Sequence, residues 1–543
     1  MSDIIRERSL KYKVIFSFLL LLSLLSGVIV FIATANGPLG YSDSVAYIVS
    51  ARNLIKGVGL GMFTPSGRFV VTYLHPPLYP LLLSGFGILG VDLVNAVRWC
   101  NFVLTVLTVF STGTIFIRYS RHPELSLVAS GLMLAFPTIL TMFMSAMSEL
   151  LFLFLLSLSC LLLLRYFRAE TKSRFILAAF VCGLLPVTRY VGIAVIIPAV
   201  VCILLFSSGV WQKRAQKAIG FGLISGIPLS IWLFILSLGS NRAFGGRSLQ
   251  IDAEYLTKGF QTYRETVTDI LWSWIPFSQR TMFQFLHPIR GLAMTIVFII
   301  IVILIWRASH RLIRDDNNET FRSDMGLNIF WGIAFVSYFF VFMATWLFTV
   351  PQTPINERLL MPLYFTGIVW LLSSWEIWLH AWLSKVNGIV QIVPWLFAAL
   401  LISWYVPQID DVIQQTHKND TVLSARWQNS QFIQAVEALP SGQAIVSNKS
   451  EIIAMWADRP AYDLMENLQL GFIKNSSPYG SDNTDSAQVA FRQGAALVVF
   501  NDFKDQFEST YGNRGKERLP TLFQGLTVVG EYPDGVIYLY SDK

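Results

Sequence analysis

Long runs of apolar residues recur along this chain of 543 residues, and they limit the folds it can adopt. A run of about 20 apolar residues crosses the ~30 Å hydrocarbon core of a bilayer as one helix. The runs leave only 14% charged residues, compared with about 25% in ordinary soluble domains. A soluble enzyme is therefore excluded, and so is a disordered chain, which would contain few apolar residues. The sequence predicts an α-helical polytopic membrane protein.

Hydrophobic segmentation predicts about eleven transmembrane helices. They lie near residues 14–34, 93–117, 125–144, 149–168, 174–189, 190–208, 216–238, 291–307, 326–350, 358–376 and 388–406. Residues 76–90 are also apolar, but 15 residues are too few to span the core. We therefore expect residues 76–90 and 43–56 to form helices that lie along the outer membrane surface.

Basic residues are concentrated in the loops on one side of these predicted spans. These loops are residues 6–13, 118–121, 165–174, 213–217 and 307–322. Because such loops usually face the cytoplasm, the N-terminus is predicted to be cytoplasmic, in the plasma (inner) membrane. The external parts are then loops 35–92 and 239–290 and the residues after 407. Loop topology also explains the net charge of +7, so no nucleic-acid partner is predicted.

The last part of the chain has a different pattern. Residues 424–439 follow an amphipathic helix pattern, whereas residues 443–448 and 496–501 resemble short buried strands. Asp534-Gly535 between two further strand patterns predicts a hairpin. The sequence therefore predicts a transmembrane domain over residues 1–407 and a small extracytoplasmic α/β domain over residues 408–543. No nucleotide-binding fingerprint occurs in it.

Two acidic residues stand at the predicted outer ends of spans. Asp43 lies in Ser42-Asp43-Ser44 just after the first span, and Glu149 opens the fourth span. Asp43 could be a helix N-cap, and Glu149 could interact with the helix dipole. Ionisable residues near membrane depth are usually functional, however. Both acids are therefore candidate catalytic residues.

Basic and aromatic residues are predicted at the same face. Arg189 and Arg358 lie on the outer side, where guanidinium groups can bind a phosphate through paired hydrogen bonds. The alternatives are helix-end arginines that reach toward water, and an ion pair between Arg358 and Glu357. His75 could donate a hydrogen bond, and Tyr79 could anchor at the membrane interface.

Together these residues predict one outward-facing site with carboxylates, arginines and a histidine. A carboxylate can deprotonate an incoming nucleophile, and arginines can stabilise a departing phosphate. An apolar groove between spans suits a lipid tail. The reaction that uses all three features is transfer of a group from a lipid phosphate.

At these residues the sequence resembles the GT-C superfamily of integral-membrane glycosyltransferases, which includes protein O-mannosyltransferases and aminoarabinose transferases that act on lipid A. The resemblance covers roughly residues 14–407. It rests on Ser42–Tyr47, His75–Pro80, Glu149, Thr188–Gly192 and Glu357–Tyr364.

The resemblance implies an inverting transferase that uses a polyprenyl-phosphate sugar as donor. It places the general base on Asp43, an assisting acid on Glu149, and phosphate binding on Arg358 and Arg189. Tyr190, next to Arg189, completes the candidate substrate-binding set with His75 and Tyr79. Asp43 and Glu149 are too few ligands to predict a divalent metal.

Two other functions remain open at this point. A secondary transporter or lipid flippase would also span the membrane, although such proteins often contain internal repeats and polar residues at mid-membrane. The other alternative is a non-catalytic receptor or assembly factor that works through its C-terminal domain. The sequence does not identify the sugar or the acceptor.

Overall fold

A computed structural model describes most of the chain. The described residues are 2–120, 122–239, 248–249, 252–275, 290–292, 295–296, 299–300, 303, 319–350, 355–375, 392–465, 494–523 and 525–540. The chain divides into two compact units. The first unit is Met1–Ala33, Tyr73–Tyr79 and Arg98–Gln415, and the second is Thr34–Thr72, Pro80–Val97 and Thr416–Lys543.

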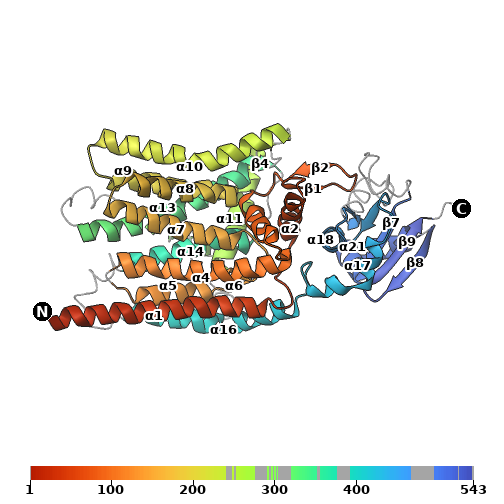
Figure 1. Cartoon of the computed structure of the whole chain (residues 1–543), viewed down its shortest axis with the longest axis horizontal. Helices are drawn as coiled ribbons and strands as arrows, with labels where there is room; N and C mark the ends of the chain where they lie inside the picture. The colour runs from red at the N-terminus through yellow and green to blue at the C-terminus, as the bar shows by residue number, and fades with distance from the viewer. Residues whose placement is uncertain are drawn as a thin grey trace. The chain divides into compact units, whose positions relative to one another are not determined.

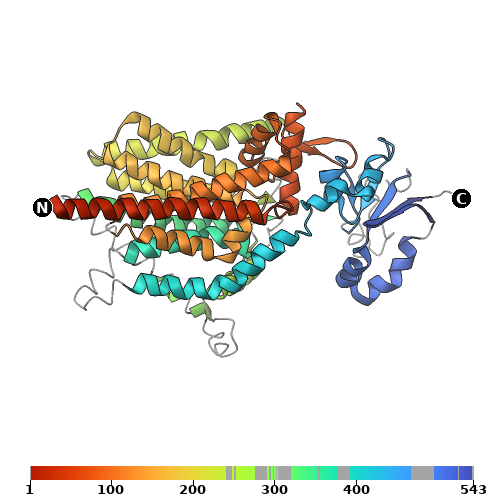
Figure 2. The same ribbon diagram turned by 60° about the horizontal axis from the view of Figure 1, so that its bottom comes forward.

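The first unit is a helical bundle whose long helices run side by side (Figures 1 and 2). Its elements are α1 (Ser2–Ala33), most of α4 (Leu93–Tyr119), α5 (Leu125–Ala135), α6 (Pro137–Phe143), α7 (Glu149–Arg168), α8 (Lys172–Thr188), η1 (Tyr190–Gly192), α9 (Ile193–Phe206), α10 (Trp211–Gly239), α11 (Ala253–Ser273), α13 (Glu319–Phe348), α14 (Glu357–Ser374), most of α16 (Val393–Lys418) and the strand pair β3 (Ser248–Leu249) and β4 (Thr349–Val350). The helical membrane fold predicted from the sequence is confirmed.

Five described helices are long and apolar enough to cross a membrane. They are Leu10–Ala33, Leu93–Tyr119, Glu149–Arg168, Trp211–Leu238 and Gly326–Phe348. The count of about eleven spans is not confirmed, and the predicted segments near 291–307 and 388–406 lie partly outside the described residues. The protein is a multi-pass integral membrane protein.

The predicted span over residues 125–144 is not one straight helix. Helices α5 and α6 meet at an angle of 79°. Phe136 adopts an extended conformation and Pro137 opens α6. This follows from the proline ring, which disfavours helical backbone at the preceding residue and is tolerated in the first turn of the next helix.

The second unit joins most of the first loop to the C-terminal residues. The loop contributes α2 (Ser42–Ile55), β1 (Gly61–Phe63), β2 (Phe69–Val71) and most of α3 (Leu78–Ile88). Helices over 43–56 and 76–90 were predicted at nearly these bounds. The prediction from sequence divided the chain at residue 407 and placed residues 35–92 with the membrane part; in the structure most of this loop groups with the C-terminal residues.

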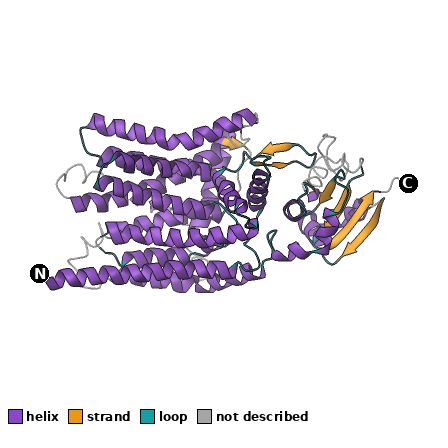
Figure 3. Ribbon diagram, in the orientation of Figure 1, coloured by secondary structure: helices purple, strands orange, loops and turns teal. Residues whose placement is uncertain are grey.

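The C-terminal residues form a mixed five-stranded sheet with flanking helices (Figure 3). The strand order is β6-β5-β7-β9-β8. The elements are η6 (Ala425–Asn429), α17 (Gln431–Glu437), β5 (Ile445–Ser447), α18 (Ser450–Trp456), β6 (Tyr462–Asp463), β7 (Ala496–Phe500), α21 (Phe503–Leu522), β8 (Leu526–Tyr532) and β9 (Gly535–Tyr540). The hairpin at Asp534-Gly535 is confirmed, whereas the helix predicted over 424–439 is interrupted at Ser430, which caps α17.

Candidate functional site

A fully buried carboxylate lies at the centre of the candidate site in the first unit. Glu149 is the first residue of α7, and its side chain is 0% exposed. Its Oε1 forms an ion pair with Arg189 and lies 3.5 Å from Nε of Arg358. A buried carboxylate is costly unless it is paired, so these contacts explain how it is accommodated.

Arg189 reaches Glu149 from the end of α8. Its backbone is extended and closes the helix, and the short turn η1 follows at once. Gly192 donates its backbone N–H to the Arg189 carbonyl at 2.7 Å, which closes that turn. A Cβ atom at Gly192 would lie 2.5 Å from the backbone carbon and oxygen of Leu185, so the turn requires glycine.

Replacement of Gly192 by Ala is therefore expected to separate η1 from α8. We expect a loss of about 1–3 kcal/mol in stability, because the added methyl group meets backbone and not a flexible side chain. Chemical denaturation of the purified protein would measure it. The control is Gly220→Ala in α10, where a Cβ meets nothing within 4 Å. Equal stability of the Gly192→Ala variant and wild type would contradict the close approach.

Arg358 comes from a third element, the first turn of α14. Asn356 caps this helix by accepting a hydrogen bond from Leu359 N at 3.0 Å, which fixes where the turn begins. The structure pairs Arg358 with Glu149 and not with Glu357, which was the alternative. Glu357 instead accepts a hydrogen bond from the Thr138 hydroxyl at 3.0 Å.

The three charged groups differ in access to solvent. The Glu149 carboxylate is sealed, whereas the side chains of Arg189 and Arg358 are 13% and 23% exposed. Their formal charges sum to +1. Two accessible guanidinium groups held against a sealed acid form a region that can bind an anion.

Tyr338 lies at the same place but was not a sequence-based candidate. It interacts electrostatically with Arg189 and Glu149, and its hydroxyl donates to the Leu359 carbonyl at 2.8 Å. Tyr338 therefore links α13 to the first turn of α14 beside Arg358. In the sequence it is one more aromatic residue in an apolar span, so no pattern distinguishes it.

Tyr190 anchors the chain that leads to His75. Its hydroxyl donates to the Tyr73 carbonyl at 2.9 Å and accepts from Trp232 Nε1 at 3.0 Å. Trp232 of α10 is a further residue that the sequence did not identify. Tyr190 thus positions the segment that enters α3, and its role in substrate binding stays a prediction.

His75 and Tyr79 differ in burial. His75 is half-buried, whereas Tyr79 is 0% exposed. The interpretation of Tyr79 as an anchor at the membrane interface is therefore wrong, because its ring is enclosed by protein. The three prolines around Tyr79 are buried as well, whereas Leu81 is exposed. One face of the first turn of α3 therefore packs inward.

Asp43 belongs to the second unit. Helix α2 begins at Ser42, so Asp43 lies in its first turn and is not the N-cap. Ser44 makes the local capping bond by accepting from Tyr41 N at 3.0 Å. The meeting of Asp43 with Arg358, which the sequence predicts, stays a prediction. Within the described residues, no three His, Cys, Asp or Glu side chains group so as to hold a metal ion.

Residues 74–232 match the family model of dolichyl-phosphate-mannose-protein mannosyltransferases. The match includes Glu149 and Arg189. The GT-C resemblance predicted from the sequence is confirmed for this part of the chain. No curated protein sequence matches the chain.

Three solved structures are similar over 97% of this chain. ArnT from Cupriavidus metallidurans in the apo state is 13% identical, with 98% of its chain covered and a TM-score of 0.48. ArnT bound to undecaprenyl phosphate is 13% identical, with 98% covered and a TM-score of 0.47. The archaeal oligosaccharyltransferase AglB from Archaeoglobus fulgidus, in complex with an inhibitory peptide and a dolichol-phosphate, is 12% identical, with 74% covered and a TM-score of 0.48.

Proposed function

We propose that this protein is an inverting glycosyltransferase that moves a sugar from a polyprenyl-phosphate donor to an acceptor at the outer face of the membrane. The family match supports the class of reaction. The proposal includes a cytoplasmic N-terminus, an extracytoplasmic C-terminal domain and a place in the plasma (inner) membrane. The acceptor supplies a hydroxyl or an amine.

The convergence of Arg189 and Arg358 on one sealed carboxylate carries this proposal. The phosphate of a glycosyl lipid is a singly charged diester, and after transfer it becomes a monoester with greater charge. Guanidinium groups already in position interact more strongly with the second state than with the first. They would therefore lower the barrier to departure of the lipid phosphate.

The reaction is a single displacement. Asp43 takes the proton of the acceptor, whose oxygen or nitrogen then attacks the anomeric carbon. The bond between this carbon and the phosphate oxygen breaks, and its electron pair leaves with the polyprenyl phosphate. Attack opposite the leaving group inverts the configuration. The role of Asp43 comes from the GT-C resemblance, and Glu149 pairs with both arginines when no phosphate is bound.

Substitution of Arg358 by Ala tests the phosphate-binding step. Purified protein in nanodiscs would be titrated with polyprenyl phosphate and assayed for transfer from a labelled polyprenyl-phosphate sugar. Truncation of a partly buried charged contact typically costs about 2–5 kcal/mol. We expect binding to weaken by about 30-fold or more.

Arg174→Ala is the matched control. Arg174 lies at the opposite end of α8 from Arg189 and donates to the carbonyls of Arg165 and Ala169 at 3.3 and 3.4 Å. This variant should bind and transfer as wild type does. Unchanged binding in Arg358→Ala would contradict the proposal.

The alternative function, transport, has its own test. Movement of the labelled sugar lipid across the membrane of sealed vesicles, without a glycosidic product, would favour a transporter.

A further inference from the structure

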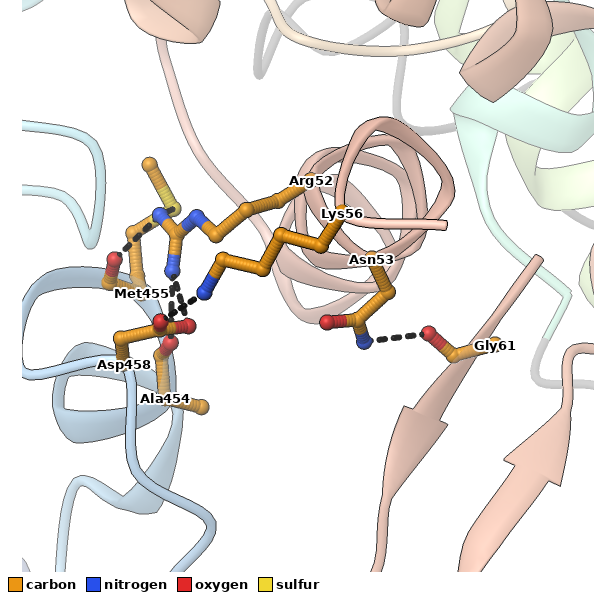
Figure 4. Close-up of polar contacts among 7 residues, drawn as sticks. All are labelled: Arg52, Asn53, Lys56, Gly61, Ala454, Met455 and Asp458. Atoms are coloured by element: carbon orange, nitrogen blue, oxygen red, sulfur yellow. Dashed lines mark hydrogen bonds and ion pairs between the residues drawn. The ribbon is translucent and has the colours of Figure 1, made fainter. Parts of the chain in front are cut away.

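Helix α2 carries Asp43 in its first turn and is held at its other end by the C-terminal residues (Figure 4). Arg52 lies in the last turn of α2. Its Nη2 donates to the Met455 carbonyl at 2.7 Å, and its Nη1 donates to Asp458 Oδ1 at 2.9 Å and to the Ala454 carbonyl at 3.4 Å. One guanidinium group thus binds three oxygen acceptors at the end of α18.

The geometry of these acceptors suits an arginine. The last carbonyls of a helix have no partner within the helix and attract a cation. Asp458 follows α18 with φ +51°, a left-handed conformation that Asp adopts more readily than most residues. This turn directs the Asp458 carboxylate toward α2, where it forms ion pairs with both Arg52 and Lys56.

Two tethers also hold the chain that enters α2. The side-chain amide of Asn419 donates to the carbonyls of Gly37 at 2.9 Å and Pro38 at 3.2 Å. The backbone N–H of Gly40 donates to the Thr421 hydroxyl at 3.0 Å. The segment that precedes Asp43 is therefore fixed to residues that follow α16.

The first turn of α2 meets α18 as well. Ser42 hydrogen-bonds with Glu451 in the first turn of α18, whereas burial and the like charges of Asp463 and Asp43 raise the pKa of this carboxyl. Glu451 at one end of α18 and Asp458 beyond the other end both contact α2. Two points of contact fix the direction of a helix as well as its place, so α18 determines where Asp43 is held.

We infer that Arg52 and Asp458 are positioning residues for sugar transfer, because they align α2, and with it Asp43, on the C-terminal domain. This inference rests on the proposed function, in which Asp43 is the base. The domain then acts in sugar transfer by holding the base in place. The ion pair joins residues 406 positions apart in the chain.

The first test variant is Arg52→Ala in the full-length protein. Small misplacement of a reacting group can lower a rate about 100-fold. We expect kcat for transfer from a labelled polyprenyl-phosphate sugar to fall about 10- to 100-fold. The KM for the donor should stay within about twofold, because donor binding is assigned to Arg189 and Arg358. If Arg52→Ala only reduced the amount of folded protein, the kcat per folded molecule would stay at the wild-type value.

Arg459→Ala is the matched control. Arg459 is the residue after Asp458, and it donates to the carbonyls of Val436, Leu439, Pro440 and Gln443. These contacts lie within the C-terminal residues and do not involve α2. This variant should lose stability while its folded fraction keeps its kcat.

Asp458→Asn serves as a second variant if Arg52→Ala does not accumulate. Asn also tolerates the left-handed conformation and keeps an acceptor oxygen, but it removes the charge. We expect a smaller decrease in kcat, about three- to tenfold. If Arg52→Ala and Asp458→Asn both keep the wild-type kcat while Asp43→Asn is inactive, the positioning role is overturned. The assignment of Asp43 as the base then still holds.

Two further outcomes would also overturn the inference. If Arg459→Ala loses as much kcat as Arg52→Ala, the effect belongs to the integrity of the domain and not to alignment of α2. If Asp43→Asn keeps full transfer, Asp43 is not the base. The positioning role of Arg52 and Asp458 then fails as well.

Discussion

Asp43→Asn is expected to lower sugar transfer by about 10²–10⁴-fold, the range typical for loss of a general base. Asn has nearly the same shape as Asp and can keep local hydrogen bonds, but it cannot accept the proton of the acceptor. Binding of polyprenyl phosphate should remain close to wild type, because the arginines assigned to it lie in other elements. Single-turnover assays with saturating labelled donor would measure the decrease.

The pH dependence of the residual activity adds a separate criterion. With an ionised carboxylate as base, wild-type activity should fall as the pH decreases and the carboxylate becomes protonated. This acid limb should disappear in Asp43→Asn. Asp505→Asn, which removes an exposed carboxylate in the first turn of α21, should keep the limb. Full transfer by a well-expressed Asp43→Asn variant would rule out this residue as the base.

Features set by local sequence were largely predictable. Residues 174–189 and 190–208 form α8 and α9 with a tight turn between them, as the apolar runs and Arg189-Tyr190 indicated. In the C-terminal part, Asp534-Gly535 gives the expected hairpin. These features follow from hydrophobic periodicity and turn chemistry, which act over a few residues.

The charged residues of the candidate site were predictable from the sequence, but the tyrosine beside them was not. Glu149, Arg189 and Arg358 were chosen because charge at the outer ends of spans is costly, and the structure brings all three together. Their roles in catalysis stay predictions. Tyr338 escaped notice because a tyrosine in an apolar span has no distinguishing pattern until its neighbours are known.

Long-range pairing was the least predictable feature. Arg52 and Asp458 look like ordinary surface charges in the sequence, and nothing local shows that they meet. The same applies to Asn419, whose amide binds the carbonyls before α2. These contacts depend on where distant segments come to lie, so the grouping of the first loop with the C-terminal residues could not be inferred from periodicity.

Substitution of Glu149 by Gln should have the largest effect on stability. It removes the carboxylate that pairs with Arg189 and Arg358 and leaves two guanidinium groups close together. Removal of one partner from a buried ion pair typically costs about 3–5 kcal/mol, because the remaining charge stays desolvated. Chemical denaturation of the detergent-solubilised protein would measure the loss. The control is Glu357→Gln, an exposed neighbour of Arg358, with an expected change within about 0.5 kcal/mol.

The same variant distinguishes a structural ion pair from a phosphate site. In wild type the Glu149 carboxylate competes with an incoming phosphate for the two guanidinium groups. In Glu149→Gln this competitor is absent, so bound polyprenyl phosphate should raise the melting temperature by more than it does in wild type. Polyprenol, which lacks the phosphate, should give no such difference. If the two lipids stabilise the variant equally, the arginines do not bind the phosphate, and the cluster serves only to hold α7, α8 and α14 together.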